Sequence, residues 1–133
     1  MNSVADTAPD PKIQGVAQIH VRARDMERAV AFYREKLGLA FLFQVPKLAF
    51  FRCGDVTLYV GLPEAPRFDH PSSILYFQVA DIHESHRALA ARGVAFEGEP
   101  HLVHKAPDHE LWMAFFGDSE GNFHALHCRK PRG

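Results

Sequence analysis

The chain has 133 residues, of which 47% are hydrophobic, and a formal net charge of −1, which suits one folded domain with a sizeable core and excludes a disordered chain. Its lysines and arginines are scattered and form no basic cluster, which argues against a nucleic-acid partner. No apolar run approaches the roughly 18 residues of a membrane span, so we expect no membrane partner either.

The first 11 residues are polar, contain prolines and lack the apolar segment of a signal peptide. We therefore expect a flexible tail at residues 1–12 and a cytoplasmic protein. Two cysteines, Cys53 and Cys128, make no disulfide framework and are predicted to be reduced thiols in that compartment.

A first module is predicted over residues 13–62. Apolar and polar residues alternate over 16–23, which is typical of a strand with one face on a core. Asp25 is a good helix N-cap, and the helix that it opens should end at Gly38, a residue that favours a left-handed C-cap. Three short strands are expected next, at 39–45, 47–53 and 55–61.

Residues 63–71 contain three prolines and no periodicity, so they are predicted to connect the first module to a second one over 72–130. The second module repeats the order, with a strand at 74–79 and a helix from Asp81 to about Arg92, closed by Gly93. Its remaining strands are expected near 94–97, 101–105, 109–116 and 122–128.

The two modules share a spacing that favours duplication. Asp25 and Asp81 lie 56 residues apart, and Gly38 and Gly93 lie 55 residues apart. A helix on one face of each sheet leaves the other face free, so two such half-cups side by side would enclose a cavity suited to a ligand. The fold class is therefore α+β, with the free strand faces as the place to look for a site.

Three motifs in this order resemble the vicinal-oxygen-chelate superfamily of glyoxalases, bleomycin-resistance proteins and extradiol dioxygenases. They are Asp25 with Phe32-Tyr33 and Leu37-Gly38, then 77–82 with Arg92-Gly93-Val94, and finally the turn at 118–122. The resemblance covers residues 13 to 128. It implies two βαβββ modules that form a cupped mixed β-sheet around a ligand cavity, with the helices outside, and a homodimer. Whether the modules of one chain close together or swap between chains stays open.

Metal-using members of that superfamily take one ligand from each of four strands. The corresponding positions here are Gln18, Tyr59, Ile74 and Ala125. Only the glutamine is an ordinary ligand, because isoleucine and alanine have no donor atom and a phenol binds such metals poorly. We therefore predict neither a metal at these positions nor any other cofactor.

A relocated metal site is the alternative. His20 and His127 lie two residues beyond Gln18 and Ala125, which keeps both on the cavity face, and Gln78 or Glu110 could supply a third ligand. The competing interpretation is that both histidines are polar lining residues or face solvent.

Other residues could line the cavity. Arg22 shares the face of His20 and could clamp a carboxylate or phosphate, or be a surface arginine at a strand end. An apolar wall could come from Tyr59, Tyr76, Trp112 and Phe123, although each could instead be packed in the core.

Three histidines surround the expected hairpin turn at Pro107. Strand alternation puts His101 and His104 on opposite sides, which argues against a metal clip that also uses His109. The hairpin is predicted to be either a lid over the cavity or a solvated tip.

The leading functional hypothesis is a metal-independent protein that binds an apolar or aromatic, possibly anionic, small molecule. The alternative is a glyoxalase-like lyase or isomerase that uses a relocated metal or His20 as a general base. No catalytic residue is assigned, and the predicted ligand-binding residues are Gln18, His20, Arg22, Tyr59, Ile74, Tyr76, Gln78, Trp112, Phe123, Ala125 and His127.

Overall fold

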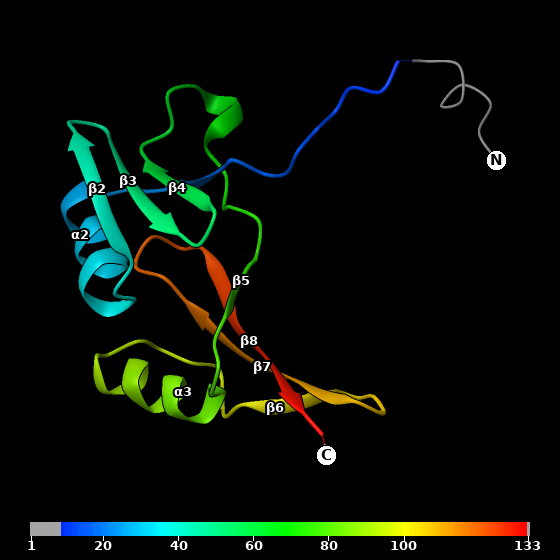
Figure 1. The fold of residues 1–133 in the computed structure, drawn as a ribbon. Coiled ribbons are helices and arrows are strands. Elements are labelled where there is room, and N and C mark those ends of the chain that lie inside the picture. Colours follow the sequence, from blue (N-terminus) through cyan, green and yellow to red (C-terminus); the bar gives the residue numbers. More distant parts are fainter. Residues whose placement is uncertain (1–8, 133) are drawn as a thin grey trace.

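The computed structural model describes residues 9–132, and most of the expected tail, residues 1–8, lies outside the described part. The first module has the expected order of elements, each within two residues of its predicted bounds (Figure 1). Its elements are β1 (Gln18–Arg22), α2 (Met26–Ala31) continued by a wider π-type turn (Phe32–Lys36), β2 (Ala40–Val45), β3 (Leu48–Cys53) and β4 (Val56–Gly61).

The second module repeats this order after a short 3₁₀ turn at Pro66–Phe68. The expected strand at 94–97 is wrong, because this stretch makes only one isolated bridge, between Phe96 and Phe116. The final strand extends beyond its predicted end at residue 128. The elements are β5 (Leu75–Gln78), α3 (Ile82–Ala91), β6 (His101–Lys105), β7 (His109–Gly117) and β8 (Phe123–Pro131).

Both helices begin and end at the predicted residues. The Asp25 carboxylate accepts a hydrogen bond from the Arg28 amide at 3.0 Å, and Asp81 accepts one from the Glu84 amide at 3.1 Å. These bonds satisfy amides that the first helical turn leaves without partners. Gly38 and Gly93 follow the helices with φ of 71° and 89°, the left-handed conformation that a side chain would strain.

Each module forms its own four-stranded sheet, in the orders β1-β4-β3-β2 and β5-β8-β7-β6. The first and last strands of a module pair in parallel, and the remaining pairs are antiparallel. The second strand of each module carries an irregularity in register, at Leu42 in β2 and at Val103 in β6. This shared defect is further evidence that the modules are copies of one pattern.

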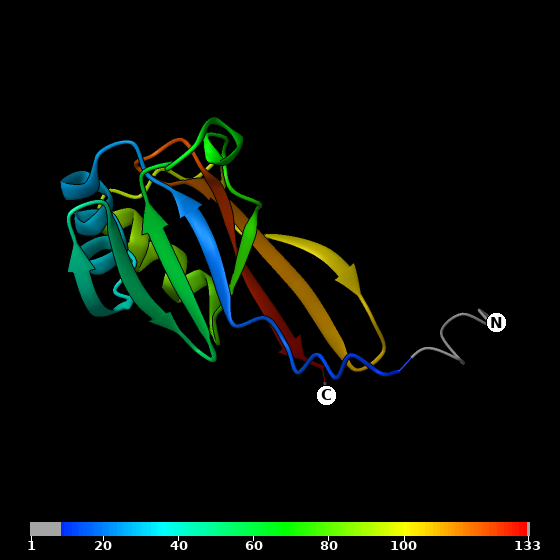
Figure 2. The same cartoon turned by 90° about the horizontal axis from the view of Figure 1, so that it is seen from above.

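The helix-covered faces of the two sheets contribute to one core. Val21, Phe51 and Leu58 of the first module belong to the same buried cluster as Phe116 and Leu126 of the second. The sheets form two layers with both helices along one side, and Figure 2 shows their strands running side by side in the view from above. Because the core lies between the layers, each sheet has its free face on the side away from that core. A helix would need more length and apolar character than any in residues 9–132 to cross a membrane.

Candidate functional site

The free face of the first sheet carries the predicted polar residues of β1. The register pairs His20 with Tyr59 and Arg22 with Gly61, and Gln18 is one pleat before His20. The residues between them on both strands belong to, or pack against, the buried core. The strand phase expected from period-two alternation therefore agrees with the structure here.

Four rings form a ladder across this face, one from each strand. The ring centroids lie 5.1 Å apart for His20 and Tyr59, 5.3 Å for Tyr59 and Phe50, and 4.4 Å for Phe50 and Phe43. Such spacings are those of interacting aromatic pairs. Phe50 and Phe43 were not predicted as site residues. An antiparallel register between β3 and β4 pairs Phe50 with Tyr59 and would have identified it.

The connecting segment, residues 62–74, folds back over part of the same face. The Tyr59 hydroxyl donates to a Glu64 carboxylate oxygen at 3.1 Å, and Arg22 pairs with Asp69 at 3.1 Å. A hollow of about 230 Å³ remains between the segment and the sheet. It is lined by Gln18, His20, Tyr59, Leu62, Glu64 and Phe68.

The second sheet carries the other predicted residues on its own free face. Tyr76 pairs with Ala125 and Gln78 with His127, while Phe123 lies one pleat before Ala125. Phe115, which sequence analysis missed, stacks on Phe123 at 5.4 Å with planes 5° apart. The Tyr76 side of this face is open, with 48% of that residue exposed.

Trp112 is not part of either free face, so its predicted place in the cavity is wrong. It pairs with buried Cys128 and packs edge-on against His83 of α3 at 5.2 Å. Its indole N–H donates to Glu110 at 3.0 Å, which also places Glu110, a suggested metal ligand, on the helix side. The phase of a nine-residue strand with few turn signals could not be fixed from the sequence.

The predicted separation of His101 and His104 onto opposite faces is also wrong. The irregularity at Val103 adds one residue, so His101 pairs with Met113 and His104 with Leu111, two positions of β7 on one face. His101 stacks on Phe115 with centroids 6.0 Å apart. At the hairpin tip His109 contacts Asp108 and Arg129 instead.

The residues at the family's metal positions do not fit a metal. Gln18 is the one ordinary ligand of the four, Tyr59 already donates to Glu64, and the side chains of Ile74 and Ala125 have no donor atoms. Within residues 9–132 no three histidine, cysteine, aspartate or glutamate side chains are grouped to hold an ion. His20 and His127, the suggested relocated pair, belong to different sheets.

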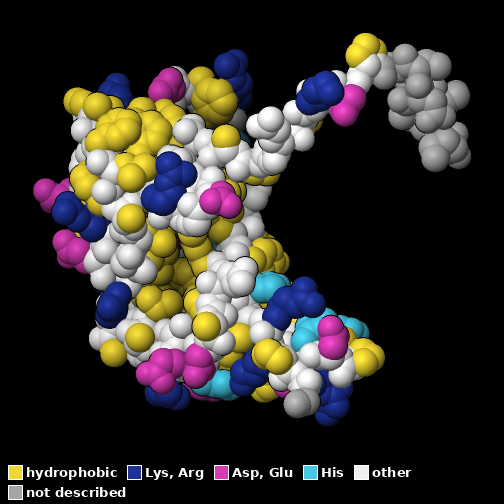
Figure 3. Space-filling view, in the orientation of Figure 1, with side chains coloured by type: hydrophobic (Ala, Val, Ile, Leu, Met, Phe, Trp, Pro, Cys, Tyr) yellow, Lys and Arg dark blue, Asp and Glu magenta, His cyan; other side chains and the backbone are white. Residues whose placement is uncertain are grey.

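Two other hollows do not lie on the free face of the first sheet. The first is lined by Ile74 and Tyr76 of the second module. Its residues from the first sheet include Ile19 and Leu58, which face the core. Another, of about 290 Å³, lies between the layers, and Figure 3 shows hydrophobic side chains lining it. Of the predicted residues only Gln78, at the end of β5, borders this one.

The surroundings of His20 favour the neutral form of its imidazole. Burial lowers the pKa of its imidazole, and the nearby His70 lowers it further, against opposing effects of the Gly61 backbone and Glu64. The imidazole is therefore neutral near pH 7 and can both donate and accept a hydrogen bond.

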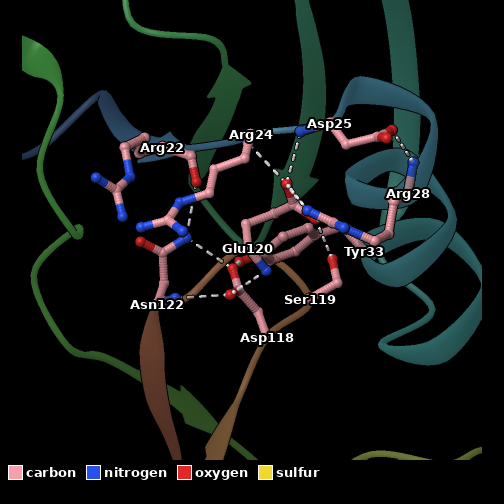
Figure 4. Close-up of polar contacts among 9 residues, drawn as sticks. All are labelled: Arg22, Arg24, Asp25, Arg28, Tyr33, Asp118, Ser119, Glu120 and Asn122. Carbon is pink, nitrogen blue, oxygen red and sulfur yellow. Dashed lines mark hydrogen bonds and ion pairs between the residues drawn. The ribbon is translucent and has the colours of Figure 1, made fainter.

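A buried polar network joins the two modules beside this face (Figure 4). Glu120, in the turn between β7 and β8, accepts hydrogen bonds from the backbone amides of Arg24 and Asp25 at 2.7 and 2.9 Å and from the Arg28 guanidinium at 2.8 Å. Burial alone would raise the pKa of Glu120, but bonds from Arg28, Ser119 and these amides lower it to about 2. The carboxylate thus fixes the start of α2 onto the second module.

Asp118 continues the network. It accepts from the Tyr33 hydroxyl and from the Asn122 side chain, and Tyr33 also contacts His124 at 2.9 Å. Asn122 donates to the Arg22 carbonyl at 2.8 Å, which ties the end of β1 to the second module. The sequence showed this turn only as a motif of resemblance, and the structure gives it a joining role.

The chain matches one known protein family over most of its length. Residues 15–123 match the model of the family described as Glyoxalase/Bleomycin resistance protein/Dioxygenase superfamily. No curated protein matches the chain.

Solved structures share the fold at low sequence identity. A lactoylglutathione lyase from Agrobacterium tumefaciens is 21% identical with a TM-score of 0.65, over 88% of this chain and 95% of that one. TnmS3, an antibiotic binding protein from Streptomyces sp. CB03234, is 24% identical with a TM-score of 0.71, over 91% and 100%. A superfamily member from Sphaerobacter thermophilus is 23% identical with a TM-score of 0.73, over 87% and 98%. With the family match spanning most of its length, the chain belongs to the Glyoxalase/Bleomycin resistance protein/Dioxygenase superfamily.

Proposed function

We propose that the protein binds a planar aromatic or otherwise apolar small molecule on its free sheet faces, without a metal at the family's usual positions. The observation that carries this proposal is the ladder of four rings, His20, Tyr59, Phe50 and Phe43, across one sheet. A flat ligand could stack there, with Gln18 and the neutral His20 as hydrogen-bonding groups. The antibiotic-binding function named for the structurally similar Streptomyces protein supports a binding role.

The complete site would need two copies of the chain. Within one copy the aromatic hollow is lined only by residues of the first sheet and the connecting segment, with no residue of the second sheet. Both faces leave large apolar side chains exposed, including Phe43 at 51%, Val45 at 44% and Tyr76 at 48%. Such exposure favours a partner surface, and β1 and β5 are edge strands. We therefore propose a homodimer in which the first sheet of one copy faces the second sheet of the other.

A matched pair of aromatic substitutions tests the binding proposal. Tyr59→Ala removes the centre of the ladder, whereas Trp112→Phe alters an aromatic residue on the helix side. With 2-naphthamide as the probe, we expect thermal stabilisation of the wild type and of Trp112→Phe. Tyr59→Ala should lose about tenfold in affinity, which corresponds to roughly 1.4 kcal/mol. Equal affinity of the three proteins, or binding by none, would contradict the proposal.

A second candidate is a lyase or isomerase with His20 as a general base. It is favoured by the lowered pKa of His20, since a neutral imidazole can take a proton near pH 7. Formation of lactoylglutathione by the wild type and by Trp112→Phe, and its loss in His20→Asn, would support it. Metal analysis of protein purified without an affinity tag separates the versions, because a relocated metal would be stoichiometric and lost in His20→Ala.

A further inference from the structure

Arg22 is a buried cation whose hydrogen bonds are incomplete. Only 5% of the residue is exposed, yet its Nε has no hydrogen-bond partner among the described residues. Its one carboxylate contact within residues 9–132 is Asp69, at 3.1 Å from a terminal nitrogen, and 60% of that aspartate side chain is exposed. A buried N–H without a partner is energetically costly, so an acceptor that also bonds the Nε–H would stabilise Arg22.

The chemistry of the better acceptor follows from the guanidinium. A planar carboxylate can take two parallel N–H bonds from one arginine, one of them from Nε. Asp69 uses only a terminal nitrogen. The adjoining hollow is lined by Arg22, Arg24 and Asp69 with Ala23, Leu62 and Pro63, so its charged side chains are two cations and one anion.

This charged hollow adjoins the aromatic one. Both share Leu62 as a lining residue, and Arg22 lies one pleat, roughly 7 Å, beyond His20 on the same face of β1. Tyr59 leans toward this end of the sheet, because a Cβ at Gly61, the partner of Arg22, would lie 2.5 Å from the Tyr59 ring. A ring stacked beside Tyr59 could therefore carry an anionic group to Arg22.

We propose that the ligand is an aromatic carboxylate whose carboxylate binds Arg22 in place of Asp69. The inference rests on the proposed binding function. It adds that the ligand is anionic and that Arg22 binds its negative charge. Asp69, carried by the connecting segment, acts as an internal carboxylate that the ligand displaces. The segment must shift to admit it, since the Arg22 Nε is buried. The hydrogen bond from Tyr59 to Glu64 is exposed, so we expect it to break when the segment shifts.

Two probes of one shape test the charge requirement. Titration calorimetry with 2-naphthoate and with neutral 2-naphthamide should show the carboxylate binding roughly tenfold tighter to the wild type. In Asp69→Asn the ratio of naphthoate affinity to naphthamide affinity should rise about threefold, because the competing charge is gone, whereas any loosening of the segment affects both probes alike. Glu99→Gln, which changes the net charge equally at an exposed position, should leave both affinities unchanged.

A structural readout accompanies the affinities. The Arg22 Nε–H resonance should move on addition of naphthoate and stay in place with naphthamide. Arg22→Gln should lower naphthoate affinity to that of naphthamide; because this residue is buried, the exposed Asp69→Asn variant decides if Arg22→Gln does not fold.

The failures are distinguishable. Equal binding of both probes to the wild type, or an Asp69→Asn effect no larger than that of Glu99→Gln, would overturn the carboxylate assignment and leave the binding function standing. Binding of neither probe would overturn the binding function, and this inference with it.

Discussion

The free faces of the two sheets differ more than the modules that present them. In the first sheet His20 stands beside Tyr59, and the connecting segment lies over the face. In the second sheet the same positions hold Tyr76 and the small Ala125, and Tyr76 is half exposed. The helix caps and the strand order are alike in both modules. The two modules are therefore alike in the features that fold the chain and differ on the faces where we propose that a ligand binds.

The largest expected effect comes from the residue that joins the modules. Glu120→Gln should lower the free energy of unfolding by about 3 kcal/mol, because buried amides and Arg28 lose a charged acceptor. Urea denaturation measures the loss, and Glu84→Gln, in an exposed pair with Arg87, should change it by less than about 0.5 kcal/mol. Hydrogen exchange should accelerate equally in β3 and β7; acceleration in β7 alone would mean that the modules unfold separately.

A pair of glycines sharpens the contrast between the sheets. Gly61→Ala should cost about 1–2 kcal/mol and weaken naphthamide binding, because the new Cβ would lie 2.5 Å from the Tyr59 ring and 3.3 Å from Leu48. Gly117→Ala in the second sheet meets only the Asn122 carbonyl, at 3.8 Å, and should be close to neutral. Thermal unfolding with and without the probe compares them. Similar losses in both variants would show that the Tyr59 ring is not held where we describe it.

The pH dependence of stability distinguishes the buried His124 from exposed histidines. Burial lowers the pKa of His124, against the opposing effect of Asp118, so the unfolded chain binds a proton there before the folded chain does. This contribution to stability is present above pH 6.5 and is lost as the pH falls below it. Between pH 7.5 and 5.5, urea midpoints should therefore fall less in His124→Asn than in the wild type. His104→Gln, at an exposed hairpin position, is the control and should follow the wild type.

Glu120 adds a second loss at lower pH. Its pKa of about 2 in the folded chain lies below the ordinary 4.5, so its contribution is present above pH 4.5 and is lost as the pH falls toward 2. The Glu120→Gln variant should lack this second phase in the same urea series; a phase that persists in the variant would assign it to other carboxylates.

The smallest effect distinguishes the two tyrosines. Tyr59→Phe keeps the ring and removes only the bond to exposed Glu64, so stability should fall by no more than about 0.5 kcal/mol. Tyr76→Phe, whose hydroxyl has no recorded partner among the described residues, should not change the unfolding midpoint. A loss above about 1 kcal/mol for Tyr59→Phe would mean that the connecting segment is held far more firmly than its exposed contacts imply.

Local chemistry explains which features could be predicted from the sequence. The caps at Asp25 and Asp81 and the alternation that puts Gln18, His20 and Arg22 on one face depend on nearest neighbours along the chain. The histidines of β6 were misplaced because one inserted residue at Val103 reverses the alternation and leaves no mark in composition.

Other features depend on contacts between distant residues. Arg22 is hydrogen-bonded to Asp69 through its side chain and to Asn122 through its carbonyl, and these partners lie 47 and 100 residues away along the chain. Likewise, the outward direction of the free faces follows from how the two modules share a core, which no single strand pattern specifies.

The central claim is that the ligand lies on the free faces and not between the layers. Amide chemical shifts of the ¹⁵N-labelled protein, titrated with 2-naphthamide, test it most directly. We expect shifts at His20, Phe50 and Tyr59, with Tyr76 and Ala125 moving in the same titration because the partner copy would complete the site. Shifts confined to Leu37, Ala88 and Arg92, which line the hollow between the layers, would contradict it.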